Sequence, residues 1–131
     1  MDLKDYFENT KGFGVLSTAD SAGKVDAAIY ARPHILDDGS WAFIMRERLT
    51  HHNLQSNPRA TYLFRESKPG YKGIRLYLTK IREEQGGELL QTLRRRQYID
   101  EKDETKYLVI FSIDMQLPLI GAGKAPSDRE G

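Results

Sequence analysis

Short apolar segments separated by turn sequences constrain the fold of this chain more than any other feature. Residues 12–19 and 25–36 are rich in small and β-branched side chains, and the polar turns SAGK and DDGS follow them. Pro33 marks an edge or a bend, because proline cannot donate to a sheet ladder. Residues 41–45, WAFIM, are apolar throughout, which is typical of a strand covered on both faces. Further strand-like runs follow at residues 60–64, 74–81 and 107–115.

These runs predict a mainly β (α+β) fold, a small six-stranded antiparallel barrel, with helices at its ends and crossovers. Leu3, Tyr6 and Phe7 lie on one face of a short helix that should end near Asn9. A second amphipathic helix is expected over residues 86–99, where leucines share one face.

Charge and composition exclude several classes of function. The net charge is +1 from 20 basic and 19 acidic residues, so no overall field attracts nucleic acid or an anionic bilayer. The absence of cysteine excludes disulfides, thiol nucleophiles and thiolate metal sites. No apolar run approaches the ~20 residues of a membrane span, and the N-terminus lacks a leader pattern. We expect a cytoplasmic protein with one domain at residues 1–120 and a flexible tail at residues 121–131.

The segment LTHHNLQSNP, residues 49–58, is the first candidate functional site. Thr50 is a suitable N-cap for a helix of about two turns that Pro58 ends. The first backbone N–H groups of such a helix lack partners within it. Arg46 and Arg48 precede them, so the segment is a candidate anion site. A capped surface helix with solvated arginines explains the same residues, and the segment alone favours that interpretation.

The histidines of this segment do not predict a metal site. Successive helical side chains diverge by about 100°, so His51 and His52 cannot easily share one ion. His34 is a possible third ligand, but no carboxylate spacing supports it. No nucleophile is fixed beside these side chains. We therefore expect no metal and name no catalytic residue, and we place His51 near a bound phosphate.

Three blocks in order, GVLSTADSAGKVDAAIYARPHIL, DDGSWAFIMRERLTHHNLQSNPRATYLF and YKGIRLYLTKI, cover most of residues 12–83. They resemble the FMN-binding split-barrel proteins related to pyridoxamine 5'-phosphate oxidase, and the ending YLVIFSIDMQLPLIG is similar to that of short members. The resemblance implies a split β-barrel with short flanking helices. It also implies a homodimer with FMN in each of two grooves at the subunit interface.

The resemblance assigns cofactor contacts to four places. The second strand would meet the isoalloxazine ring through Ala31, Arg32, Pro33 and His34. The strand before the short helix would flank the ring and ribityl chain through Phe43, Ile44, Met45 and Arg46. The helix start would hold the phosphate through Leu49, Thr50 and His51, and the partner chain would complete the groove with Tyr71, Lys72 and Arg75.

These features favour an FMN-binding flavoprotein, either a small oxidoreductase or an electron carrier, with a nicotinamide or another small molecule as reductant. The oxidase has a basic residue where Thr50 stands and a further C-terminal segment, so pyridoxamine 5'-phosphate oxidase activity is not expected. A non-catalytic flavin- or haem-binding module and a deazaflavin-dependent reductase are the alternatives. Core packing alone explains Phe43 and Ile44. Arg32 and Arg46 each need an anionic partner or access to solvent.

Overall fold

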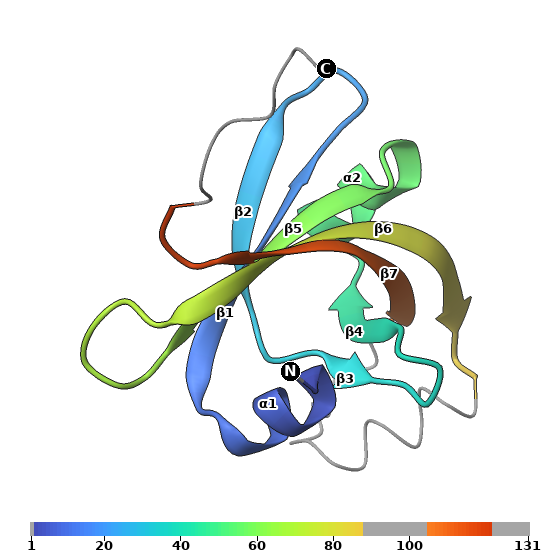
Figure 1. Ribbon diagram of the computed structural model, residues 1–131. Coiled ribbons are helices and arrows are strands. Elements are labelled where there is room, and N and C mark those ends of the chain that lie inside the picture. The colour runs from blue at the N-terminus through green and yellow to red at the C-terminus, as the bar shows by residue number, and fades with distance from the viewer. Residues whose placement is uncertain (1, 88–104, 122–131) are drawn as a thin grey trace.

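The computed structural model describes residues 2–87 and 105–121 of the chain. Within this part, seven antiparallel strands form one strongly curled sheet with the order β2-β1-β5-β6-β7-β4-β3 (Figure 1). The strands are β1 (Gly12–Ala19), β2 (Val25–Tyr30), β3 (His34–Ile35), β4 (Trp41–Arg46), β5 (Arg59–Glu66), β6 (Gly73–Gln85) and β7 (Lys106–Pro118), and the helices are α1 (Leu3–Asn9) and α2 (Leu49–Ser56). No helix in the described residues is long and apolar enough to cross a membrane.

Two predicted segments fall largely outside the described residues. These are the amphipathic helix expected over residues 86–99 and the tail expected over residues 121–131.

The strand number corrects the six strands predicted from sequence, and Pro33 supplies the reason. Residues 25–36, predicted as one extended segment, divide into β2 and β3. β2 pairs with β1 and β3 pairs with β4, so the two halves of the segment lie at opposite ends of the sheet order. Pro33 is buried between them, where the chain leaves one edge for the other and no ladder hydrogen bond is needed.

β4 is buried on both faces, as its apolar sequence predicted. Trp41, Phe43 and Met45 belong to the main core inside the curled sheet. Ala42 and Ile44 belong to a second apolar cluster on the opposite face, shared with β7. Because strand side chains alternate between faces, the side chains of Phe43 and Met45 are committed to the core.

Helix α1 packs against the main core with the face that the sequence predicted. Phe7 is buried, and Leu3 and Tyr6 are partly buried against the same cluster. The Phe7 ring meets those of Trp41 and Phe64 edge to face, at centroid distances of 5.2 and 5.0 Å. Such aromatic contacts add to the apolar burial and fix α1 on the sheet.

Candidate functional site

The start of α2 lies where β2 and β4 end. Helix α2 packs against β1, β2 and β4, and a short turn after β4 leads into it. In that turn the amide of Arg48 donates to the carbonyl of Arg46 at 2.8 Å. Asn53, within the helix, donates through Nδ2 to the Thr18 hydroxyl on β1 at 3.1 Å. The sequence-predicted residues of β2, β4 and the helix start are therefore brought to one region of the molecule.

The helix begins before the residue predicted to cap it. The N-cap is Arg48, whose side chain makes no capping hydrogen bond, and Thr50 lies in the first turn with 4% of its surface exposed. The Thr50 side chain hydrogen-bonds to the hydroxyl of Tyr30 on β2. Burial raises the pKa of Tyr30, and this hydrogen bond lowers it in part. The prediction of Thr50 as N-cap is wrong because its hydroxyl is turned inward, toward β2.

The first turn of α2 contains backbone donors that have no partner within the helix. The first hydrogen bond of the helix runs from the amide of His52 to the carbonyl of Arg48, at 2.9 Å. For the amides of Leu49, Thr50 and His51, the structure records no acceptor within the described residues. The first turn contains no acidic residue. Open N–H groups and the helix dipole favour an anion at this position.

The ring of His51 is bound by a carboxylate. It is buried and stacks on Tyr107 with 3.9 Å between ring centroids. Its Nε2 lies 3.1 Å from Oε2 of Glu83, while Gln55 and Lys80 donate to Oε1 of Glu83, each at 3.1 Å. The side chain of His51 thus belongs to an internal polar cluster, and its contribution to an anion site is its backbone amide.

Sequence reasoning missed Glu83, and the irregularity of β6 explains why. Lys80 and Glu83 are three positions apart, which places side chains of a regular strand on opposite faces. A register shift between Lys80 and Arg82 changes this alternation, so both side chains meet at His51. Burial by itself raises the pKa of Glu83, but hydrogen bonds from Gln55, His51 and Lys80 outweigh it and lower this pKa below its usual 4.5.

Arg32 finds its partners at the end of α1. Its Nη1 donates to the carbonyls of Phe7 at 2.6 Å and Thr10 at 2.9 Å, which satisfies carbonyls that the helix itself leaves open. The neighbouring carbonyl of Ala31 accepts from the Tyr62 hydroxyl at 3.0 Å. Burial raises the pKa of Tyr62, so this hydroxyl remains a donor. These bonds fix the course of the chain just after β2.

The residues assigned to the partner chain lie far from α2 within one copy. β5 has eight residues, from Arg59 just after α2 to Glu66 before the next loop, which corresponds to roughly 25 Å. Tyr71 and Lys72 lie in that loop, and Arg75 donates to the carbonyls at positions 118 and 121 at 3.0 and 2.9 Å. A single copy therefore does not bring these residues to the start of α2.

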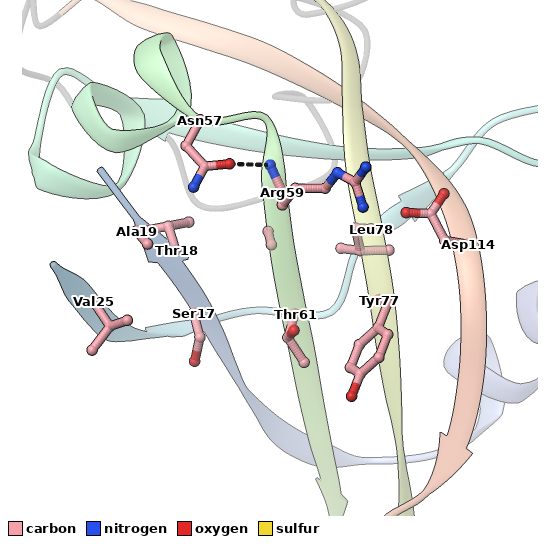
Figure 2. A pocket seen from close by; sticks show the side chains of 11 residues that line it. Ser17, Thr18, Ala19, Val25, Asn57, Arg59, Thr61, Tyr77, Leu78 and Asp114 are labelled. Atoms are coloured by element: carbon pink, nitrogen blue, oxygen red, sulfur yellow. Dashed lines mark hydrogen bonds between the residues drawn. The ribbon is translucent and has the colours of Figure 1, made fainter. Parts of the chain in front are cut away.

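A separate groove of about 400 Å³ lies on the outer face of the sheet, near the end of α2. Figure 2 shows Ser17, Thr61 and Tyr77 on three neighbouring strands of its floor. Arg59 and Asp114 extend toward one another across β6 in the same view. No sequence pattern singles out Arg59 or Asp114, because their approach depends on strand order and on the register shift beside Asp114.

Comparison with known proteins identifies the fold. No protein-family model and no curated protein matches the chain. An FMN-binding protein from Syntrophomonas wolfei is 20% identical with a TM-score of 0.71, over 88% of this chain and 82% of that one. A putative pyridoxamine 5'-phosphate oxidase from Lactobacillus delbrueckii is 12% identical with a TM-score of 0.67, over 89% and 92%. HutZ, a haem storage protein from Vibrio cholerae, is 14% identical with a TM-score of 0.68, also over 89% and 92%.

These structures show that the chain has the split-barrel fold of the pyridoxamine 5'-phosphate oxidase-like proteins. The fold implied by the sequence resemblance is therefore confirmed. The functions of these proteins differ, so the fold leaves the ligand of this chain to be argued from its own residues.

The Glu83 cluster predicts a pH dependence of stability. Because the pKa of Glu83 is lowered in the folded state, its contribution is complete above the usual value of 4.5 and is lost as the pH falls through the folded pKa. Replacing Glu83 with glutamine should flatten the fall in unfolding free energy below pH 4.5, measured by urea denaturation. Glu84→Gln, on the neighbouring position, is the control that should retain the wild-type slope. An unchanged slope in Glu83→Gln would contradict the assignment.

Proposed function

We propose that the chain is an FMN-binding flavoprotein that acts as a homodimer, with the phosphate at the start of α2. The observation that carries this proposal is the set of open amides at Leu49, Thr50 and His51. A phosphate dianion offers several acceptor oxygens, so this donor set fits it. The FMN-binding protein of the same fold supports the choice of flavin.

The flanking residues fit the remaining parts of the cofactor. Arg46 and Arg48 are exposed beside the open amides and add positive charge for the phosphate. Residues 31–34 would lie along the ring. The side chains of Phe43 and Met45 are committed to the core, so β4 would contribute backbone groups and the side chains of its other face.

A second copy is needed to complete the groove. Tyr71 is 72% exposed, and with Lys72 it lies at the far end of β5 from α2. Arg75 is engaged by carbonyls at the end of β7, so we assign the partner contact mainly to Tyr71 and Lys72. Such an arrangement places each cofactor between two copies.

The bound flavin supplies hydride or electron transfer, and the chain binds it, orients it and controls access. We propose a small oxidoreductase or an electron carrier, reduced by a nicotinamide or another small molecule. His51 and Glu83 are engaged with each other beside α2, so we assign them no part in proton transfer.

A haem-binding module is the second candidate, because HutZ, a haem storage protein, shares the fold. The chain has three histidines. His51 is buried between Tyr107 and Glu83, which leaves His34 and His52 as the imidazoles for haem iron. Neither is placed in a preformed haem cavity by the described residues, and we therefore rank FMN first.

The visible spectrum separates these candidates. The full chain, purified and incubated with FMN, should be yellow with the two-band spectrum of a flavin, and acid should release FMN that mass spectrometry identifies. A single intense Soret band would favour haem, and a released deazaflavin would favour the reductase alternative. A protein that stays colourless after incubation with FMN would contradict the proposal.

Removing one amide donor tests the phosphate site directly. Proline is tolerated at the first helical position, and Arg48 before it is already extended (φ −130°, ψ −171°). Leu49→Pro should therefore keep α2 but lose one N–H, and weaken FMN binding roughly 10- to 100-fold, as expected for a hydrogen bond to a charged group. Leu49→Ala keeps the amide and is the matched control. Equal FMN affinities in the two variants, measured by flavin fluorescence titration, would contradict the phosphate assignment.

A further inference from the structure

The groove on the outer face of the sheet combines two charged side chains, Arg59 and Asp114, with apolar surface. It has a volume of about 400 Å³, within the range of small-molecule sites. It lies near Asn57, at the end of α2, whereas the proposed phosphate site lies at the other end of that helix. The groove is therefore distinct from the place proposed for FMN.

Two opposite charges face each other across the groove, and within residues 2–87 and 105–121 no ion pair joins them. Arg59 begins β5 and Asp114 lies on β7, with β6 between them, and Figure 2 shows their side chains extending toward each other. Among the described residues, the structure records no ion pair for either group. A ligand with an anionic and a cationic group of its own would satisfy both.

Local structure fixes the Asp114 side chain and the backbone position from which the Arg59 side chain extends. A register shift between β6 and β7 leaves Asp114 as the extra residue between Ile113 and Met115, so its side chain turns out of the regular ladder. The Thr79 hydroxyl then donates to Oδ2 of Asp114 at 2.5 Å, and no group of the described residues donates to Oδ1. The amide of Arg59 donates to Oδ1 of Asn57 at 3.1 Å, which ties the start of β5 to the end of α2.

The remainder of the groove separates into a hydroxyl row and an apolar wall. Ser17, Thr61 and Tyr77 are register partners on β1, β5 and β6, so their side chains form one row across the floor. Val25, which is 77% exposed, and Ala19 form the wall beside them. An apolar group of modest size would bury this wall and the ring of Tyr77.

We propose that this groove binds a free amino acid with an apolar side chain. Its carboxylate would pair with the Arg59 guanidinium, which can donate two parallel hydrogen bonds to a carboxylate. Its ammonium group would pair with Oδ1 of Asp114, and its side chain would cover Val25 and Tyr77. This site does not depend on the flavin proposal, because it shares no residue with the start of α2.

The first part of the test varies the ligand. The full chain, with whatever cofactor it holds, is titrated with L-phenylalanine by isothermal calorimetry and by amide NMR. 3-Phenylpropanoate lacks the ammonium group and 2-phenylethylamine lacks the carboxylate, so each should bind at least ~10-fold more weakly than L-phenylalanine. Amide shifts should centre on β5, β6 and Asp114. The absence of binding at millimolar L-phenylalanine would overturn the proposal, and is expected if a second copy covers the groove. Amide shifts centred on another part of the chain would also overturn it.

The second part varies the protein. Arg59→Ala should weaken binding of L-phenylalanine at least ~10-fold but leave the affinity for 2-phenylethylamine nearly unchanged, because that ligand has no carboxylate. Asp114→Asn keeps an acceptor for Thr79. It should weaken binding of L-phenylalanine but leave the affinity for 3-phenylpropanoate unchanged, because that ligand has no ammonium group. Arg65→Ala, at the other end of β5, is the control for loss of charge. Equal loss for all three ligands in both variants would indicate a general structural effect and overturn the pairing.

Discussion

The proposed phosphate site depends on the inward orientation of the polar side chains of α2. Thr50 is bonded to Tyr30, the His51 ring is bound by Glu83, and Asn53 is bonded to Thr18. These contacts attach the helix to the sheet through groups that otherwise cap a helix or bind a ligand. What remains at the first turn is backbone N–H, which an incoming anion can satisfy. The rigid attachment also prepares those amides in advance, so little ordering opposes binding.

The break at Pro33 gives this helix its surroundings. Because the chain crosses from the β2 edge to the β3 edge at this proline, β2 and β4 lie near opposite ends of the sheet order, and α2 packs against both. Arg32 and Tyr62 fix the crossing through backbone carbonyls. The apolar segments therefore build the barrel, and the irregular positions between them determine where a ligand can approach.

Much of the fold followed from the sequence, because burial on regular strands and helices leaves a periodic pattern. The face of α1 around Phe7 and the two-sided burial of residues 41–45 were predicted for this reason. The prediction of one strand over residues 25–36 was wrong because the chain bends at Pro33. The prediction of Thr50 as N-cap was wrong because its side chain hydrogen-bonds to Tyr30 and does not cap the backbone of its own helix. Glu83 and Asp114 were missed because register shifts change which face a strand side chain occupies, and such shifts leave no periodic signal.

The central claim is that backbone amides at the start of α2 bind a phosphate group, and comparison of FMN with riboflavin tests it most directly. The two molecules share the ring and the ribityl chain, so the ratio of their Kd values reports the phosphate alone. Hydrogen bonds from several amides to a dianion predict that FMN binds at least ~100-fold more tightly than riboflavin. Equal affinities for FMN and riboflavin, or no measurable affinity for either, would contradict the account.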